Sequence, residues 1–389
     1  MGSLLIFQSG GPTSVINSTL NGVIRRCKDR GIAVYGALYG IEGLIRHEVV
    51  DLTSLPYNRL CLLRQTPGTA LGTSRKKITS DFPHWKEVEQ TLIDLDVDYL
   101  LVNGGNDSMD TALRLHEHFV SWGLKVVGIP KTIDNDLLGT DFCPGYPSAC
   151  RHVMNSVASI VLDGRSYSGG KVNLIEIQGR EAGWLTAPAS LIKGASAPDL
   201  VLLPEMKWEW EDLLNRIHDI YKEKGCAFIV LSEGIDIPHE TFSGTDEFGH
   251  AMNEGVCFAL ASSLHERFSL PVRPIALSTL CRADPFLISK VDSDKAQWLG
   301  EAAVDAALSG ECGIMVGLRR SGEKTLHFAL EKTPLRIPAD QERLFPEEWI
   351  QGYSITKEFG AYLLPLIKEG IEVKTDKEGL FLFTDLLGK

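Results

Sequence analysis

The chain has 389 residues, of which 44% are hydrophobic and 23% are charged, and its formal net charge at pH 7 is −12. This length predicts two or three domains, and the composition excludes a disordered or fibrous protein. The negative charge argues against nucleic acids and anionic membranes as partners, because their phosphates would be repelled. The apolar runs are far shorter than the roughly 20 residues that cross a bilayer.

Strands and helices alternate along the chain, which predicts parallel sheets covered by helices. In the first part, the expected strands are 3–8, 98–102 and 125–130, and the expected helices are 15–27 and a helix from about 108 to 122. The alternation then restarts, with strands at 171–177, 199–203, 226–231, 273–280 and 313–318, and with helices after 180, at 208–224 and at 295–308. We therefore expect an α/β protein of two Rossmann-like three-layer domains with a cleft between them.

Cysteine usage and the first residues both favour a cytoplasmic protein. The eight cysteines are scattered and none forms a CxxC pair, so we expect reduced and mostly buried thiols rather than disulfides or a zinc site. The first six residues carry no basic segment of a secretion signal and are expected to begin the first strand.

Residues with suitable chemistry follow the ends of six expected strands. In open α/β sheets, ligands bind beyond the carboxyl ends of the strands. One shared site is therefore predicted, although these positions alone name no substrate. The positions are Gly11, Asn106-Asp107, Thr132 to Asp136, Arg180, Glu233 and Arg282.

Two glycine pairs could bind phosphate. Gly10-Gly11 and Gly104-Gly105 each precede a helix, where glycine lets the backbone approach a ligand and the helix amides attract anions. Neither loop matches the dinucleotide or P-loop pattern. An ordinary tight turn is the alternative for each pair taken singly.

The segment from Lys131 to Asp136 is the strongest catalytic candidate. Asp134 and Asp136 are expected on one side of an extended segment, where one carboxylate could take a proton while the other orients it or helps to hold a metal ion. An Asx-turn is the structural alternative. The adjacent Lys131 favours phosphoryl transfer, because a cation beside two carboxylates suits that chemistry.

Other charged residues give weaker signals. Arg75, next to a Gly-Thr-Ser turn, is a candidate for an anion contact. Lys76 and Lys77 are expected to be solvated. His116 and His118 are expected on the surface, because a spacing of two residues on a helix points them in different directions.

These segments together resemble the 6-phosphofructokinase family and, in detail, its bacterial pyrophosphate-dependent branch. The resemblance covers about residues 3 to 320 and implies the phosphofructokinase fold. It also implies transfer of a phosphoryl group from pyrophosphate to the 1-hydroxyl of fructose 6-phosphate, reversibly and with Mg²⁺, in glycolysis and gluconeogenesis. The matching segments, in the family's order, are Ser9-Gly10-Gly11, Leu71 to Arg75, Gly104 to Ser108, Pro130 to Asp136, Gln178 to Arg180 and Ser232 to Gly234.

The resemblance also implies a role for each matching position. Asp134 would be the catalytic base, with Lys131, Asp107, Thr132 and Asp136 beside it, and Asn106 would contact the metal. Lys171 and Arg273 would reach the 6-phosphate across a subunit interface, which implies a homodimer or homotetramer. The donor-binding residues would be Gly11, Arg75, Asp107 and Lys131. The substrate-binding residues would be Thr132, Ile133, Asp134, Gln178, Gly179, Arg180, Glu233, Thr279 and Arg282, with Lys171 and Arg273.

Two positions favour pyrophosphate as the donor. ATP-using members of the family carry glycine where this chain has Asp107 and Lys131. The Asp107 carboxylate would repel the α-phosphate of a nucleotide, whereas the Lys131 ammonium suits pyrophosphate. An ATP-dependent 6-phosphofructokinase and a catalytically silent regulatory subunit are the alternatives.

Four positions depart from the family pattern. Asn106 replaces an aspartate, which would leave more of the metal binding to Asp107 or Asp134. Gln178 replaces a methionine and Thr279 a histidine on the sugar side, and Asn21 replaces an arginine of the nucleotide effector site.

The expected domain division follows the family. Residues 1–141 with about 281–332 would form the donor domain. Residues 142–280 with about 333–389 would form the sugar-phosphate domain.

Overall fold

The computed structural model describes residues 2–238, 244–245, 251–252, 255–321 and 326–388. The chain forms two compact units. The first comprises Met1–Ser148, Arg282–Glu342 and Ile367–Lys389, and the second comprises Ala149–Cys281 and Arg343–Leu366. None of the helices described is both long enough and apolar enough to span a bilayer.

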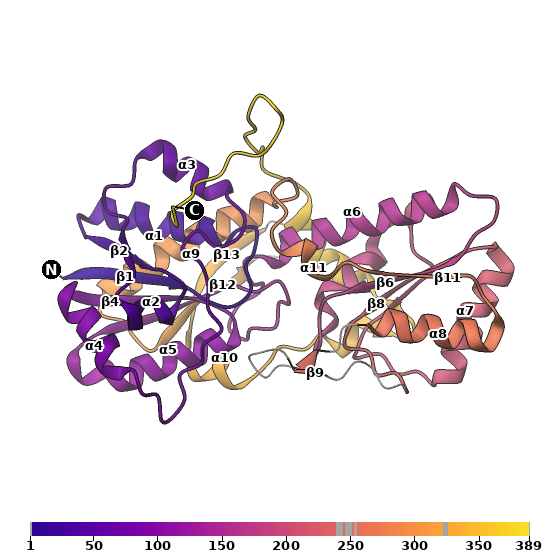
Figure 1. The fold of residues 1–389 in the computed structure, drawn as a ribbon, viewed down its shortest axis with the longest axis horizontal. Helices are drawn as coiled ribbons and strands as arrows, with labels where there is room; N and C mark the ends of the chain where they lie inside the picture. The colour runs from indigo at the N-terminus through magenta and orange to yellow at the C-terminus, as the bar shows by residue number, and fades with distance from the viewer. Residues whose placement is uncertain (1, 239–243, 246–250, 253–254, 322–325, 389) are drawn as a thin grey trace. The chain divides into compact units, whose positions relative to one another are not determined.

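A seven-stranded sheet forms the centre of the first unit, in the order β13-β12-β5-β4-β1-β2-β3 (Figure 1). The strands are β1 (Ser3–Gln8), β2 (Val34–Ala37), β3 (Val49–Asp51), β4 (Val97–Gly104), β5 (Lys125–Pro130), β12 (Ile314–Ser321) and β13 (His327–Pro334). The five inner strands are parallel, and the edge strands β3 and β13 are antiparallel to their neighbours. Every residue of β1 is buried, as expected for a parallel strand covered on both faces.

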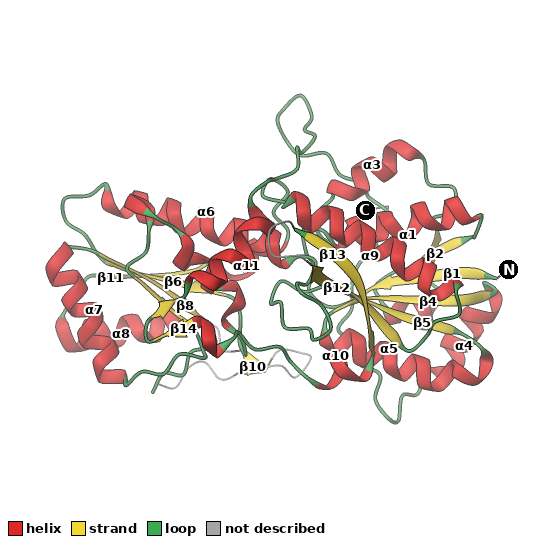
Figure 2. Ribbon diagram, turned by 180° about the vertical axis from the view of Figure 1, so that it is seen from behind, coloured by secondary structure: helices red, strands yellow, loops and turns green. Residues whose placement is uncertain are grey.

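Helices cover both faces of this sheet. Figures 1 and 2 show α1 and α9 on one face, and α4, α5 and α10 on the other. On the second face, Val88 of α4 and Leu115 of α5 share a buried core with Leu5 and Val102 of the sheet. The helices of this unit are α1 (Ile16–Arg30), α2 (Ile41–Arg46), α3 (Tyr57–Gln65), α4 (Trp85–Asp94), α5 (Asn106–Phe119), η1 (Val120–Trp122), α9 (Lys290–Leu308) and α10 (Arg336–Asp340).

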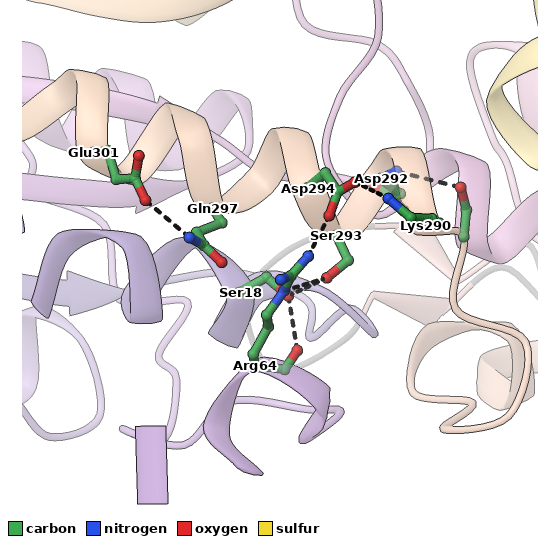
Figure 3. Close-up of polar contacts among 9 residues, drawn as sticks. Ser18, Arg64, Lys290, Asp292, Ser293, Asp294, Gln297 and Glu301 are labelled. Atoms are coloured by element: carbon green, nitrogen blue, oxygen red, sulfur yellow. Dashed lines mark hydrogen bonds and ion pairs between the residues drawn. The ribbon is translucent and has the colours of Figure 1, made fainter. Parts of the chain in front are cut away.

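Helices α1 and α9 approach each other closely at two glycines. A Cβ atom on Gly22 would lie 2.1 Å from the Gln297 carbonyl oxygen, and one on Gly300 would lie 2.2 Å from the Thr19 carbonyl oxygen. Real side chains do not tolerate such distances, so both positions require glycine. Polar contacts line the start of α9, where Arg64 of α3 contacts Ser293 and Asp294 (Figure 3).

The second unit contains a four-stranded parallel sheet in the order β11-β6-β8-β7. Leu213 of α7 and Leu260 of α8 pack with Leu174 and Ile229 of the sheet in one buried core. The strands are β6 (Val172–Ile177), β7 (Leu200–Leu202), β8 (Ala227–Ser232) and β11 (Val272–Ala276), and the α-helices are α6 (Tyr146–Arg165), α7 (Trp210–Lys224), α8 (Val256–Phe268) and α11 (Lys357–Ile367). The short elements are η2 (Gly183–Leu185), η3 (Ala187–Leu191), η4 (Gly194–Ser196), η5 (Ser278–Arg282), η6 (Glu347–Trp349), and the strand pairs β9 (Gly244–Thr245) with β10 (Ala251–Met252) and β14 (Ile350–Gln351) with β15 (Ser354–Ile355).

The alternation of strands and helices predicted from the sequence is confirmed, with local differences. The strand expected at 273–280 ends at Ala276, and Ser278 has a φ of 44°, which a strand does not accommodate. The segment after Arg180 forms short 3₁₀ turns rather than an α-helix. Helix α9 begins at Lys290, earlier than expected, because the Ser289 side chain accepts a hydrogen bond from the Asp292 amide.

The expected domain boundaries are wrong toward the C-terminus. Residues 333–342 and 367–389 were expected in the second domain, but they belong to the first unit. Strand β13 pairs along its whole length with β12, and the Thr384 amide donates to the Thr66 hydroxyl beside α3. Residues 343–366 do belong to the second unit, where Phe345 packs edge-on against the buried Trp184.

The predictions for cysteine and histidine are largely confirmed. All eight cysteines are free thiols, of which five are buried. His118 is exposed and stacks on Trp85. His116 differs from the expectation, because it is half-buried and lies against Gly313.

Candidate functional site

Most residues expected on the donor side follow three neighbouring strands of the first unit, whereas Arg75 lies between α3 and α4. Strands β1, β4 and β5 are parallel and adjacent, so their carboxyl ends meet at one edge of the sheet. Gly11 follows β1, Asn106 and Asp107 follow β4, and Lys131 follows β5 directly. The sheet therefore brings together groups that are distant in the sequence, as predicted.

The loop after β1 is fixed by hydrogen bonds from two sides. The Gly10 amide donates to the Ser74 carbonyl (3.2 Å), and the Thr73 hydroxyl donates to the Gly10 carbonyl (2.6 Å). The Lys131 ammonium donates to the Gly11 carbonyl (2.6 Å). Gly10 has a φ of +77°, a conformation that favours glycine.

Lys131 is a buried cation at the centre of this edge. Lys131 is only 3% exposed, and burial lowers the pKa of its ammonium to about 8. The carboxylates of Asp134 and Asp136 act in the opposite direction, whereas Arg282 and Arg75 lower this pKa further. Four charged side chains, Asp134, Asp136, Arg282 and Arg75, thus influence the pKa of Lys131.

Asp134 lies in a bend rather than in the extended segment expected. Its amide donates to the Thr132 hydroxyl (3.1 Å), and this hydroxyl donates to Asp134 Oδ2 (3.4 Å). The following Asn135 has a φ of 56°, and its side-chain oxygen accepts a hydrogen bond from the Cys143 amide (2.9 Å). The bend weighed as the alternative is therefore present, but the Thr132 hydroxyl, rather than an aspartate carboxylate, accepts the local amide hydrogen bond.

Asp136 is a buried carboxylate beside Asp134. Burial, followed by the charge of Asp134, raises the pKa of Asp136 well above its usual range. Asn106 Nδ2 lies 3.4 Å from Asp136 Oδ2 and donates to it. A cation bound between these groups would relieve the repulsion between the two carboxylates.

Oxygen atoms of Asn106 and Asp136 fit a magnesium ion. In the part of the chain that the structure describes, Oδ1 of each residue is buried without a hydrogen-bond partner. Mg²⁺ prefers oxygen ligands and usually combines one or two carboxylates with water and substrate phosphates. The described residues contain no group of three or more His, Cys, Asp or Glu side chains that could hold a metal ion. Water and substrate phosphates would therefore have to supply the other ligands.

Lys77 forms an ion pair that the sequence analysis did not anticipate. Its side chain is exposed, as expected, but its ammonium lies 3.0 Å from Asp107 Oδ1, in the first turn of α5. The two side chains are 45% and 56% exposed. The position of Lys77 two residues after Arg75 could have indicated it, since alternate residues of an extended segment point the same way.

The residues expected around the sugar lie mainly in the second unit. Gln178, Gly179 and Arg180 follow β6, and Glu233 follows the adjacent β8. The Gly179 amide donates to Glu233 Oε1 (3.2 Å), and Arg180 Nε lies 3.8 Å from the same oxygen. Glu233 thus holds the turn that carries Arg180.

Four residues expected with this group, Thr132, Ile133, Asp134 and Arg282, belong to the first unit. Thr132 and Ile133 are buried there beside Asp134. Arg282 also belongs to this unit, and its guanidinium lies 3.9 Å from the position of a Cβ atom on Gly11. The structure thus places Arg282 beside Gly11, in the loop after β1.

Lys171 and Arg273 lie at the other end of the second sheet. Lys171 precedes β6 while Gln178 follows it, and a strand of this length spans about 20 Å. Arg273, near the start of β11, lies 3.6 Å from Asp163 of α6. Within one chain, these two cations are therefore not grouped with Arg180. Thr279 is exposed in η5, between β11 and Arg282.

Comparisons with known proteins point to one family. The protein family described as phosphofructokinase matches residues 3–307. A pyrophosphate–fructose 6-phosphate 1-phosphotransferase of Xanthomonas campestris is 35% identical over 99% of this chain and 96% of its own length. An ATP-dependent 6-phosphofructokinase of Mycobacterium bovis is 32% identical over 81% of this chain and 90% of its own.

A solved structure extends the likeness to the whole fold. The crystal structure of a pyrophosphate-dependent phosphofructokinase from Marinobacter aquaeolei superposes with a TM-score of 0.88 and 29% identity. The match covers 98% of this chain and 95% of that one. The fold expected from the sequence is thereby confirmed.

Proposed function

This chain belongs to the phosphofructokinase family, and on that premise we propose that it transfers a phosphoryl group from pyrophosphate to the 1-hydroxyl group of fructose 6-phosphate. The products are fructose 1,6-bisphosphate and phosphate. The reaction is reversible and serves glycolysis and gluconeogenesis. The single observation that carries the choice of donor is the pair Asp107 and Lys131 at the carboxyl edge of β4 and β5.

Asp134 and Lys131 carry the chemical step in this proposal. The Asp134 carboxylate takes the proton of the 1-hydroxyl group as its oxygen bonds to phosphorus, and the bond from that phosphorus to the bridging oxygen breaks. The electron pair of that bond leaves with the released phosphate. Lys131 is buried beside Gly11, in the loop after β1, where its positive charge stabilises the negative charge that develops on the phosphate oxygens.

Asn106 and Asp136 are the residues we propose for Mg²⁺. A bound magnesium ion would neutralise charge on the phosphate oxygens during transfer. Asp107 is a weaker candidate than it was in the sequence analysis, because its carboxylate is paired with Lys77.

The donor and acceptor groups belong to different units in this proposal. The first unit binds pyrophosphate with Gly11, Arg75 and Lys131. The second unit binds the sugar phosphate with Gln178, Gly179, Arg180, Glu233 and Thr279, assisted by Thr132, Ile133 and Arg282 of the first unit. Lys171 and Arg273 of a partner subunit would bind the 6-phosphate, so we propose a homodimer or homotetramer in the cytoplasm.

Two alternatives are less well supported. An ATP-dependent enzyme would have to accept the Asp107 carboxylate near the α-phosphate of the nucleotide. A silent regulatory subunit would have no use for the ordered set of Asp134, Lys131 and Arg180.

The test is the initial rate of fructose 6-phosphate phosphorylation with Mg²⁺, measured with pyrophosphate and with ATP. We expect turnover with pyrophosphate and none with ATP. Turnover with ATP alone would overturn the proposed donor but leave Asp134 as base. No turnover with either donor would favour the regulatory subunit or another sugar.

A further inference from the structure

We propose that Lys77 is a donor-binding residue, held in place by Asp107, that contacts the phosphoryl group of pyrophosphate farther from Lys131. This inference rests on the proposed function and deepens it. It assigns Asp107 a second role, since the carboxylate would then orient a cation as well as repel nucleotides.

The position of Lys77 is the first argument. The segment that carries Lys77 also carries Thr73 and Ser74, which fix the Gly10 backbone from one side. Lys77 then reaches the first turn of α5, where its ammonium lies 3.0 Å from Asp107 Oδ1. One segment therefore contacts both phosphate-binding loops that the sequence predicted.

The number of donors left on each cation is the second argument. Lys131 is buried, and one of its N–H groups is already directed to the Gly11 carbonyl. The Lys77 side chain is 45% exposed, and its ion pair with Asp107 engages one of the three N–H donors of the ammonium. The remaining donors are available to a phosphate at the start of α5, where the helix amides also favour an anion.

The charge of the donor is the third argument. Both phosphoryl groups of pyrophosphate are negatively charged, and the chain as a whole repels anions with its net charge of −12. Binding must therefore come from local cations. Lys131 is buried beside the Gly11 carbonyl, where the charge of Arg75 influences its pKa, whereas Lys77 supplies a cation on the Asp107 side.

The variant Lys77→Met tests the proposal, with Lys76→Met as the matched control. Both lysines are exposed neighbours, and Lys76 has no ion pair within the described ranges. We expect Lys77→Met to weaken magnesium pyrophosphate binding about tenfold, measured by calorimetry without sugar, because a hydrogen bond to a charged group is lost. The KM for pyrophosphate should rise similarly while the KM for fructose 6-phosphate stays unchanged. Lys77→Arg should retain most of the affinity.

A double-mutant cycle tests the role of Asp107. Asp107→Asn alone should weaken pyrophosphate binding by a smaller factor than Lys77→Met. If Asp107 acts on pyrophosphate by holding Lys77, the double variant should bind no more weakly than Lys77→Met alone. Since an exposed ion pair contributes little to folding, the thermal unfolding midpoint should not change in any of these variants.

The outcomes separate this proposal from the proposed function. If the unsubstituted protein binds and uses pyrophosphate but Lys77→Met behaves as Lys76→Met does, Lys77 is a surface residue and the inference is wrong. If the unsubstituted protein neither binds nor uses pyrophosphate, the proposed donor fails, and the role of Lys77 fails with it.

Discussion

At the scale of single residues, the candidate site buries charged side chains, each of which would destabilise the fold if it were buried alone. Lys131 is buried against two carboxylates, and Asp136 is buried against Asp134. A buried charge is tolerated when opposite charges or hydrogen bonds compensate it. The lowered pKa of Lys131 and the raised pKa of Asp136 are typical of a functional site.

Replacing the proposed base gives the first prediction at this scale. Asp134→Ala should abolish phosphoryl transfer, because it removes the proposed proton acceptor, and the neighbouring Asp136 carboxylate is assigned to Mg²⁺ in this proposal. Fructose 6-phosphate binding should persist, and calorimetry should detect it. A variant that retained the full rate would remove Asp134 as the base.

The pKa of Lys131 gives a second prediction, on the pH dependence of the rate. Because this pKa is lowered to about 8, the ammonium is charged below that pH and loses its charge as the pH rises through it. Thus kcat/KM for pyrophosphate, which reports the free enzyme, should fall above about pH 8. Pyrophosphate also titrates, so the profile is compared with that of Lys131→Arg, whose charge persists. The fall should move to higher pH in that variant, and identical profiles would contradict the assignment.

At the scale of elements, one buried carboxylate joins the starts of two helices. Asp292, in the first turn of α9, accepts hydrogen bonds from the Gly145 and Ser148 amides (both 3.0 Å) and from the Ser148 hydroxyl (2.5 Å), at the start of α6. Asp294, on the same turn, instead forms partly exposed ion pairs with Arg64 and Lys290 (Figure 3).

This contrast predicts very different effects of two similar substitutions. Asp292→Ala would leave buried donors unsatisfied, and it should lower the free energy of unfolding by about 3 kcal/mol. Asp294→Ala should cost less than about 1 kcal/mol, because surface ion pairs contribute little. Urea denaturation followed by circular dichroism measures both. If both variants lost the same free energy of unfolding, the burial of Asp292 would not determine how much it contributes to stability.

At the scale of the whole molecule, each unit has its own sheet and core, and the proposed activity needs residues of both. The cations Lys171 and Arg273 lie at the amino-terminal end of the second sheet, whereas Arg180 lies beyond its carboxyl end. A single 6-phosphate group cannot contact both ends of a strand of about 20 Å. The site shared between subunits that we propose would resolve this separation.

A complementation experiment tests that arrangement. Arg180→Ala and Arg273→Ala should each raise the KM for fructose 6-phosphate strongly. When the two variants are co-expressed, mixed dimers should contain one site with neither substitution, and activity should recover. Mixed dimers that form but remain inactive would place Arg273 outside the site.

The sequence by itself determined the class of fold and most of the candidate site. Apolar strands followed by glycine and charged residues, as at Gly10-Gly11 and Lys131 to Asp136, carry a local signal, because strand ends and turns depend on nearby residues. The ordered segments also identified the family before any geometry was known.

Only the tertiary structure decided which distant groups meet. The contact of Lys77 with Asp107 and the antiparallel addition of β13 to the first sheet join segments with no local signal for each other. The sequence also contained no sign that Oδ1 of Asn106 and Oδ1 of Asp136 would both be buried without a hydrogen-bond partner among the described residues. Nor did it indicate that β6 would separate Lys171 from Arg180. Such contacts depend on packing between elements, which local propensity and periodicity do not encode.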